Sequence, residues 1–414
     1  MNTLEKRLRA DAEAILRASI GAVKPDSAVR RALEGARFPG RVFLVAVGKA
    51  AWQMASVARE TLPALAGGVV VTKYGHVKGK IADVACYEGG HPVPDENSLR
   101  GTATALALTE RLRADDTVLF LLSGGGSALF EQPLLPLADL QDITRALLAA
   151  GADIVEINTV RKRLSAVKGG RFAAHCAPAQ VCAIVLSDIV GDPLDMIASG
   201  PACPDRSTCA QARAIAEKYA LRLSAQARAL LDAETPKALS NVTTKITGSV
   251  RELCAAAADE CRALGYEPLL LTDRLTCEAR EAGSFLASVA RTHANDGKNL
   301  AFLAGGETVV HLTGSGKGGR NQELALAAAL GIEGLSNALI LSAGSDGTDG
   351  PTDAAGGIVD GGTAEAMRLR GVDPAQALRD NDSYRALQAA DALLITGPTG
   401  TNVNDVSLIL LRAE

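Results

Sequence analysis

Aromatic side chains are scarce in this chain of 414 residues. Phe, Trp and Tyr make up only 3% of the sequence, although hydrophobic residues as a whole make up 47%. The interior must therefore be built from Ala, Leu, Val and Ile, which is typical of parallel sheets covered by helices. A chain of this length is too long for one ordinary core, so we expect two domains of roughly 150 to 250 residues.

An excess of charge of either sign is also missing. Lys plus Arg total 43 against 47 Asp plus Glu, so the net charge is only -4. A chain with this balance has no general attraction for nucleic acid or for an anionic membrane. We therefore expect no nucleic-acid partner and no membrane partner.

The sequence also lacks a metal-binding cysteine motif, a signal peptide and a membrane span. Its eight cysteines include no CxxC pair, so we expect reduced thiols scattered through the core. Acidic residues interrupt the amphipathic N-terminal pattern, and no apolar run reaches the roughly 20 residues needed to span a bilayer. These absences predict a cytoplasmic protein.

What the sequence does contain is a set of glycine-rich turns that follow short apolar runs. The run Val42–Val47 stops at Gly48 and Lys49 before a helical pattern, which predicts a strand, a tight turn and a helix. Lys49 would then lie beyond the carboxyl end of a strand, where open α/β sheets bind ligands. A cation at the N-terminus of a helix is unfavourable unless an anion joins it, so we favour a functional Lys49 over a solvated one.

A second turn of this kind follows the apolar run Thr117–Leu122. It reads Ser123-Gly124-Gly125-Gly126-Ser127, and glycines between hydroxyls can form a nest of N–H donors for phosphate. The turn matches neither the P-loop pattern GxxxxGK[ST] nor the dinucleotide pattern GxGxxG. A turn that only clears space for packing is the alternative, but it would not need both serines.

The stretch Gly305–Leu326 combines glycines, cations and the start of a helix. Lys317 and Arg320 come just before a segment rich in Ala and Leu. Glycine backbone, a helix N-terminus and two cations outline a site for phosphate or carboxylate. A solvated surface hairpin is the alternative.

A basic run lies between Ile157 and Phe172. It contains Arg161, Lys162, Arg163, Lys168 and Arg171. Runs of charge usually lie on solvated helix faces, and this is our main expectation. A contribution to an anion-binding cleft is the minority alternative.

Two further turns are rich in aspartate. The apolar run Val181–Leu186 leads to Asp188 and Asp192, whose carboxylates suit proton abstraction or metal coordination as well as ordinary turn capping. A second acidic turn holds Asp346, Asp349 and Asp353 beside hydroxyl and carbonyl groups, the hard oxygen ligands that Mg²⁺ prefers. Its length and acid density favour a site over a plain turn, although it does not fit an EF-hand.

Cationic glycine loops, a Gly/Ser nest and an acidic loop are together the parts that phosphoryl transfer needs. These loops resemble the class of glycerate 2-kinases whose C-terminal part is called the MOFRL domain. The resemblance covers nearly the whole chain in matching order. It is carried by VAVGKAA (Val45–Ala51), GGHPVPD (Gly89–Asp95), LLSGGGSAL (Leu121–Leu129), LSDIVGDP (Leu186–Pro193), GGRNQE (Gly318–Glu323), SAGSDGTDGPTDAAG (Ser342–Gly356) and TGPTGTNVND (Thr396–Asp405).

The resemblance implies ATP-dependent phosphorylation of D-glycerate to 2-phosphoglycerate with Mg²⁺. It also implies two α/β domains, a Rossmann-like three-layer N-terminal domain and a C-terminal mixed-sheet domain of MOFRL type, with the active site in the cleft between them. We place the boundary after Pro236, where a helical segment ends, which gives domains 1–236 and 237–414. The protein is expected to be a monomer or a homodimer.

Roles for individual residues follow from the same resemblance. Lys49 and Arg320 would neutralise the substrate carboxylate and the transferring phosphate. Asp188, or as a second choice Asp192, would orient or deprotonate the glycerate hydroxyl. Ser123–Ser127 would hold the nucleotide phosphates together with Lys317. Magnesium would be bound by Asp346, Asp349 and Asp353.

Two other functions remain open at this point. Members of the class have also been labelled hydroxypyruvate reductases, which would use NAD(P)H, but the sequence lacks GxGxxG. A non-catalytic sensor of sugar acids or nucleotides is the other alternative. Lys49, Asp188, Arg320 and Asp346 argue against it, because a sensor does not need a base and metal ligands together.

Overall fold

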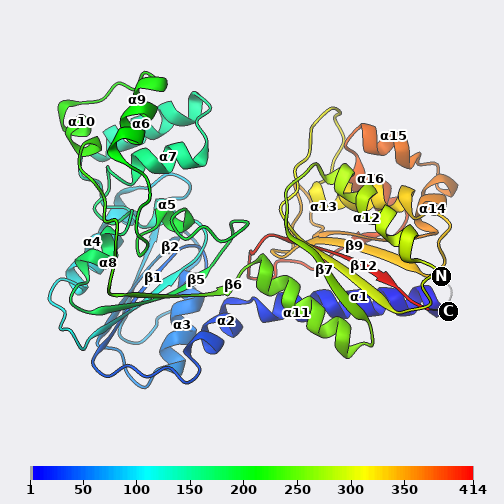
Figure 1. Ribbon diagram of the computed structural model, residues 1–414, viewed down its shortest axis with the longest axis horizontal. Helices are drawn as coiled ribbons and strands as arrows, with labels where there is room; N and C mark the ends of the chain where they lie inside the picture. The colour runs from blue at the N-terminus through cyan, green and yellow to red at the C-terminus, as the bar shows by residue number, and fades with distance from the viewer. Residues whose placement is uncertain (1–2, 414) are drawn as a thin grey trace. The chain divides into compact units, whose positions relative to one another are not determined.

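A computed structural model of the protein describes residues 3–413, and these residues form two compact units (Figure 1). One unit consists of Ala28–Ser187 and Asp192–Thr247, and we call it the parallel-sheet unit. The other described residues form the mixed-sheet unit. The fold class expected from the sequence, two α/β domains with one parallel and one mixed sheet, is confirmed. An active site in a cleft between the domains stays a prediction.

The parallel-sheet unit has the strand order β3-β2-β1-β4-β5-β6, and β1 to β5 run parallel. Every residue of β1 and β4 is buried, as expected for apolar central strands that are covered on both faces. The strands are β1 (Val42–Val47), β2 (Gly67–Lys73), β3 (Val84–Gly89), β4 (Thr117–Leu122), β5 (Gln180–Leu186) and β6 (Val242–Gly248).

Helices cover both faces of this sheet. On one face α2 (Pro25–Leu33) and α3 (Ala51–Thr61) pack on side chains such as Leu44 and Leu121. On the other face the ring of Phe120 packs against Phe172 at a centroid distance of 4.7 Å. The further helices are α4 (Glu96–Leu108), α5 (Gly126–Leu129), α6 (Leu137–Ala149), α7 (Ile154–Arg161), α8 (Arg171–His175), η1 (Ile197–Ser199), α9 (Cys209–Lys218) and α10 (Ala225–Leu231).

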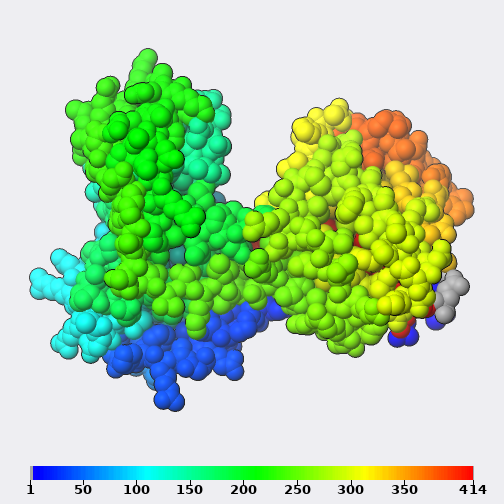
Figure 2. All heavy atoms as spheres, viewed as in Figure 1, coloured from blue at the N-terminus to red at the C-terminus, as the bar shows by residue number. Residues whose placement is uncertain are grey.

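α6, α7, α9 and α10 share a separate apolar core, to which Leu140, Ile157 and Ala212 contribute. Figure 2 shows the green atoms of α9 and α10 on the outer surface of this helical group.

The mixed-sheet unit has the strand order β11-β10-β9-β12-β8-β7. β7 and β8 are parallel, and the other neighbours are antiparallel. β12 lies in the middle, and its first residue, Asp405, pairs with both Gly306 and Gly344. The strands are β7 (Glu267–Leu275), β8 (Leu300–Gly306), β9 (Ala338–Gly344), β10 (Gly356–Asp360), β11 (Leu393–Leu394) and β12 (Asp405–Leu411).

This second sheet is also covered on both faces. α1 (Thr3–Ala22) and α11 (Val250–Ala263) share one core with Leu303 and Leu408. α12 (Ala279–His293) and α13 (Arg320–Gly331) pack on the opposite face with Phe302 and Ile409. The remaining helices are α14 (Thr363–Leu369), α15 (Pro374–Arg379) and α16 (Ser383–Ala389).

The grouping of the chain differs from the predicted division into 1–236 and 237–414 at three places, the shortest of which is Asp188–Gly191 in the mixed-sheet unit. α1 packs on the mixed sheet, because its buried side chains, such as Leu8 and Ile15, share a core with α11 and with strands of that sheet. β6 lies beside β5 in the parallel sheet rather than in the C-terminal part. Among the described residues, no helix is both long enough and apolar enough to cross a membrane.

Candidate active site

The turns after β1 and β4 meet at the carboxyl edge of the parallel sheet, because these strands are neighbours. The backbone N–H of Lys49 donates a hydrogen bond of 2.9 Å to the carbonyl of Gly124. Gly48 has a φ of 115°, and a Cβ there would lie 2.3 Å from Ser123 Oγ, so the close approach requires glycine. Lys49, whose side chain is exposed, therefore lies beside the loop Ser123–Ser127.

Lys49 and His91 lie close to the middle of this loop. A Cβ on Gly125 would lie 3.0 Å from His91 Cδ2 and 3.2 Å from Lys49 Cγ, so both side chains flank the glycine. Burial lowers the pKa of His91, and the charges of Lys49, Lys73 and His76 lower it further. The sequence favours a structural role for His91, but its position makes it a candidate hydrogen-bond donor to an anion on the loop.

Four cations of the basic run that starts at the end of α7 are buried and the fifth, Arg171, is half-buried, so the expectation of a solvated face was wrong. The side chains of these cations find buried carboxylates far away in the sequence, which no helical spacing could indicate. Arg161 and Lys168 lie 3.6 and 3.4 Å from Glu131, and Lys162 and Arg163 lie 3.2 and 3.8 Å from Asp205.

The two aspartates that follow β5 belong to different units. Asp188 is grouped with the mixed-sheet unit, and its carbonyl accepts a hydrogen bond of 3.0 Å from Asn404 Nδ2. Asp192 is grouped with the parallel-sheet unit and has a φ of 52°. Its Oδ1 is buried without a hydrogen-bond partner within residues 3–413. Of this pair, Asp188 faces the cavity of the mixed-sheet unit.

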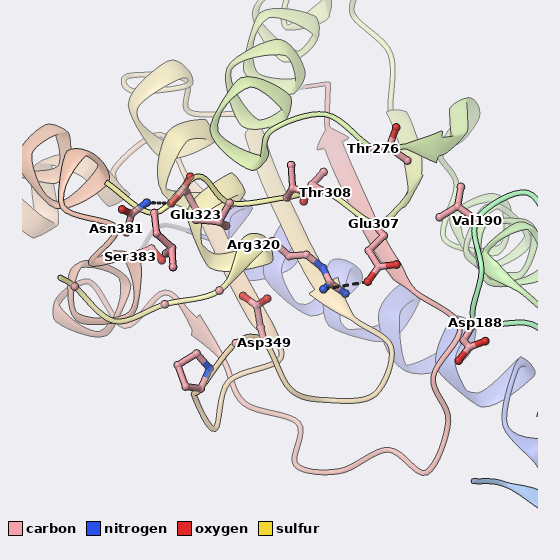
Figure 3. Close-up of a pocket in the computed structure, with 18 of the residues that line it drawn as sticks. Asp188, Val190, Thr276, Glu307, Thr308, Arg320, Glu323, Asp349, Asn381 and Ser383 are labelled. Carbon is pink, nitrogen blue, oxygen red and sulfur yellow. Dashed lines mark hydrogen bonds and ion pairs between the residues drawn. The ribbon is translucent and has the colours of Figure 1, made fainter. Parts of the chain in front are cut away.

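That cavity has a volume of about 880 Å³ and lies where β8 and β9 end and β12 begins (Figure 3). Its size is in the range of small-molecule sites, which are typically 300–1,000 Å³. Val309 and Leu312, which are 52% and 82% exposed, give it an apolar side. Its polar lining includes Asp188, Glu307, Arg320, Glu323, Asp349 and Asn381.

Arg320, the first residue of α13, is held on two sides by carboxylates. Its Nε and Nη2 donate to Asp405 Oδ2 and Oδ1 over 2.5 and 3.0 Å, and its Nη1 lies 3.3 Å from Glu307 Oε1. Burial lowers the pKa of Arg320, but the hydrogen bond and charge of Asp405 raise it overall. The fork expected to grip a substrate oxyanion is therefore occupied by Asp405, and Nη1 is the nitrogen directed toward Glu307 in the cavity (Figure 3).

Asp349 takes the N-terminus of α13, where the sequence predicts an external anion. Its carboxylate accepts hydrogen bonds from the backbone N–H groups of Asn321 and Gln322 over 3.2 and 2.8 Å. A Cβ on Gly319 would lie 2.3 Å from this carboxyl carbon, so the glycine makes room for it. Burial raises the pKa of Asp349 to about 6, and the nearby Asp405 contributes to the rise. An internal carboxylate thus caps the helix.

The acidic turn does not gather its aspartates into a shared metal site. Asp346 Oδ1 accepts from the N–H of Thr348, and Asp353 accepts from the hydroxyl of Tyr384 over 2.8 Å. Lys317 also contacts this tyrosine, with Nζ 4.2 Å from the ring centroid. Among residues 3–413, no group of three or more His, Cys, Asp or Glu side chains is arranged to hold a metal ion.

Sequence analysis assigned no role to three residues that shape this cavity. Glu307 directly follows β8, Asp405 begins β12, and Asn404 precedes Asp405 with a φ of 68°. Asn404 Nδ2 donates to the carbonyl of Asp188 and to Glu307 Oε2, which links two cavity walls. The sequence signal that could have identified two of them is the motif Thr396–Asp405, whose final residues are Asn404 and Asp405.

Two family descriptions match the chain. Residues 11–232 match "Domain of unknown function (DUF4147)", and residues 300–405 match the "MOFRL family". The second match covers the segment that builds most of the cavity.

Related proteins match nearly the whole chain. A "D-glycerate 2-kinase" of Thermotoga maritima is 54% identical over 404 residues, which cover 96% of this chain and 97% of the relative. A "Putative hydroxypyruvate reductase" of Agrobacterium vitis is 40% identical over 90% of this chain and 87% of the relative. A crystal structure of glycerate kinase from Thermotoga maritima has a TM-score of 0.95 and 53% identity, covering 98% of this chain and 100% of that chain.

Proposed function

The chain belongs to the glycerate 2-kinase family, and we propose that its two loop systems divide the work of this reaction between nucleotide and acceptor. The reaction transfers a phosphoryl group from ATP to D-glycerate and gives 2-phosphoglycerate. The observation that carries this conclusion is the 54% identity to a D-glycerate 2-kinase over 96% of the chain. This match includes both the loop Ser123–Ser127 and the cavity around Arg320.

The carboxyl edge of the parallel sheet is proposed to hold the phosphates of ATP. Loop Ser123–Ser127 offers backbone N–H groups, and Lys49 and His91 both lie close to Gly125. A lysine charge can stabilise the negative charge that develops on the transferring phosphoryl group. Lys49 is therefore assigned to that group, and the loop to the nucleotide phosphates.

The cavity of the mixed-sheet unit is proposed to hold glycerate. Arg320 is oriented by Asp405, and Nη1, which lies 3.3 Å from Glu307 Oε1, is the nitrogen that we assign to a carboxylate or phosphate oxygen entering beside Glu307. Asp188 lines the same cavity, and the bond from Asn404 fixes its backbone. We assign Asp188 to the glycerate hydroxyl as the group that orients it and accepts its proton.

Magnesium does not fit a shared site of Asp346, Asp349 and Asp353. Asp349 uses both carboxylate oxygens as the cap of α13, and Asp353 faces Tyr384. Mg²⁺ in kinases is usually held by one or two carboxylates together with substrate phosphates. Asp346 is the member of the set that we propose for such a contact. Lys317 stays a proposed nucleotide contact.

The decisive experiment follows the product made from ATP and D-glycerate by ³¹P and ¹³C NMR, with ADP release measured in parallel. A kinase gives phosphate on carbon 2 and one ADP per product. The reductase activity named for the Agrobacterium vitis relative is tested in the same preparation by measuring oxidation of NADH with hydroxypyruvate. NADH oxidation without ADP release would favour the reductase, and neither reaction would favour a sensor.

Cytoplasmic location and a monomeric or homodimeric state stay predictions. Sedimentation of the purified chain would decide the second.

A further inference from the structure

Behind the loop Ser123–Ser127 lies a pair of buried cations that the proposed reaction does not use directly. The side chain of Lys168 is 0% exposed and that of Arg161 is 10% exposed. Both lie near the carboxylate of Glu131, which is also 0% exposed. Charged groups are rarely buried unless they are paired, because each loses several kcal/mol of hydration.

Both cations bind the same carbonyl group of the loop. Arg161 Nη2 donates to the carbonyl of Ser127 over 2.9 Å, and Lys168 Nζ donates to it over 2.8 Å. Lys168 also donates to the carbonyl of Phe130 over 2.9 Å. Charge-assisted hydrogen bonds of this kind are shorter and stronger than neutral ones. The end of the loop is therefore held at one point by two positive charges.

The charge of this group is not balanced. The charged groups that act on Lys168 are Glu131 and Arg161, so among the described residues two cations face one carboxylate. The neighbouring cations of the same run are different. Lys162 and Arg163 share Asp205, and each has a further carboxylate, Asp195 and Glu234 respectively.

A buried excess of positive charge is costly when it stands alone and becomes favourable when an anion binds nearby. The place where an anion can approach this excess is the loop whose last carbonyl the cations hold. The hydroxyl of Ser127 is also hydrogen-bonded to the hydroxyl of Ser199, with 2.9 Å between the two oxygens. The loop and the cations therefore form one electrostatic unit.

We propose that Lys168 and Arg161 are positioning residues that fix the Ser127 end of the loop and raise its affinity for an anionic oxygen group. This inference rests on the proposed function in naming that group as the phosphates of ATP. We call Lys168, Arg161 and the Ser127 end of the loop the platform. Its charges require only an anion, so they would also recognise a glycerate carboxylate.

The titration of Lys168 gives the platform a dependence on pH. Burial lowers the pKa of Lys168 to about 8, Glu131 acts to raise it, and Arg161 lowers it further. Below this pH the group carries its charge, and above it the excess charge is lost. Affinity for the anion is therefore expected to fall between pH 7 and 9.5, where the phosphates of ATP, with a second pKa near 6, keep their charge.

Calorimetric titration of the full chain with ATP at several pH values measures this affinity without relying on turnover. We expect Lys168→Met to weaken ATP binding at least about tenfold at pH 7 and to remove the fall in affinity at higher pH. Lys162→Met is the matched control, because it also removes a buried lysine from the same run but does not contact Ser127. It should leave the dissociation constant of ATP within about twofold.

Glu131→Gln keeps both cations and supplies a second test if Lys168→Met does not fold. Because Glu131 raises the pKa of Lys168, its removal should move the midpoint of the affinity profile to lower pH. An unmoved midpoint, or equal losses in Lys168→Met and Lys162→Met, would overturn the platform. Weaker binding of glycerate alone in Lys168→Met would support the platform but contradict the assignment of the loop to ATP.

Discussion

The contact between Arg320 and Asp405 predicts that charge alone will not preserve activity at position 320. Lysine retains the positive charge but has one nitrogen, whereas Arg320 uses Nε and Nη2 together on Asp405. Arg320→Lys should therefore lose the orientation of the side chain in the cavity. We expect kcat to fall about 10²-fold or more, nearly as far as in Arg320→Ala, which is the scale for losing one preorganised oxyanion contact.

The structure also gives the expected change in stability. Removing one partner of a buried ion pair costs about 3–5 kcal/mol, because the other charge is left without a partner. The Asp405 side chain is 8% exposed, but that of Arg320 is 34% exposed. Solvent screening at the arginine therefore places the cost of Arg320→Ala below this range, at about 2–3 kcal/mol, and that of Arg320→Lys at about 1–2 kcal/mol.

A double-mutant cycle of Arg320→Lys and Asp405→Asn tests this reasoning by urea unfolding and by kcat. Groups in direct contact should show a coupling free energy of about 1 kcal/mol or more. The control is Arg368→Lys with Glu333→Gln, an equally two-pronged pair in which the side chains are 48% and 36% exposed. That pair should couple by less than about 1 kcal/mol. Additive effects at Arg320 and Asp405, or a lysine variant within a few-fold of wild type, would refute the positioning role.

Three other variants test the remaining assignments. Lys49→Ala should remove most turnover at saturating glycerate with an unchanged circular dichroism spectrum, because it removes the cation beside Gly125. Lys6→Ala, at an exposed lysine of α1, is the control. Near-normal turnover of the Lys49 variant would contradict the proposed role of Lys49. Asp346→Asn should raise the Mg²⁺ concentration needed for half-maximal rate, since an amide lacks the negative charge that holds a hard cation, and an unchanged titration would make Asp346 structural. Asp349→Ala should lower the free energy of unfolding by about 1–2 kcal/mol more than Asp349→Asn, because asparagine can still accept from the N-terminus of α13. Equal free energies of unfolding for the two Asp349 variants would show that the capping hydrogen bonds contribute little to stability.

The strands and their turns could be predicted because the information is local. The apolar runs at β1 and β4 have the expected bounds, Val42–Val47 and Thr117–Leu122, and each ends in the predicted glycine turn. β3 was missed because Val84–Gly89 is an edge strand that is mostly half-exposed and has no continuous apolar run. Period and turn chemistry identify buried central strands better than edge strands.

The partners of charged groups could not be predicted, because they depend on contacts between distant segments. Arg320 and Asp405 are 85 residues apart, and Lys168 meets the carbonyl of Ser127 from 41 residues away. Asp349 was predicted to bind metal because three aspartates in one turn suggest it. Only the fold shows that this carboxylate reaches back to α13. The residue types of the site were therefore evident, but the atoms they contact were not.

The position of β12 has a consequence for how the chain folds during synthesis. The parallel-sheet unit is nearly continuous in sequence, from Ala28 to Thr247, so it can fold soon after it leaves the ribosome. The mixed-sheet unit cannot, because its middle strand lies at residues 405–411 and α1, made before the parallel-sheet unit, packs on the same sheet. At about 5–20 residues per second, synthesis from the end of α1 to the end of β12 takes roughly 20 to 80 seconds, so the apolar face of α1 waits on that order for the complete sheet. During that interval chaperones and proteases can reach the apolar face of α1.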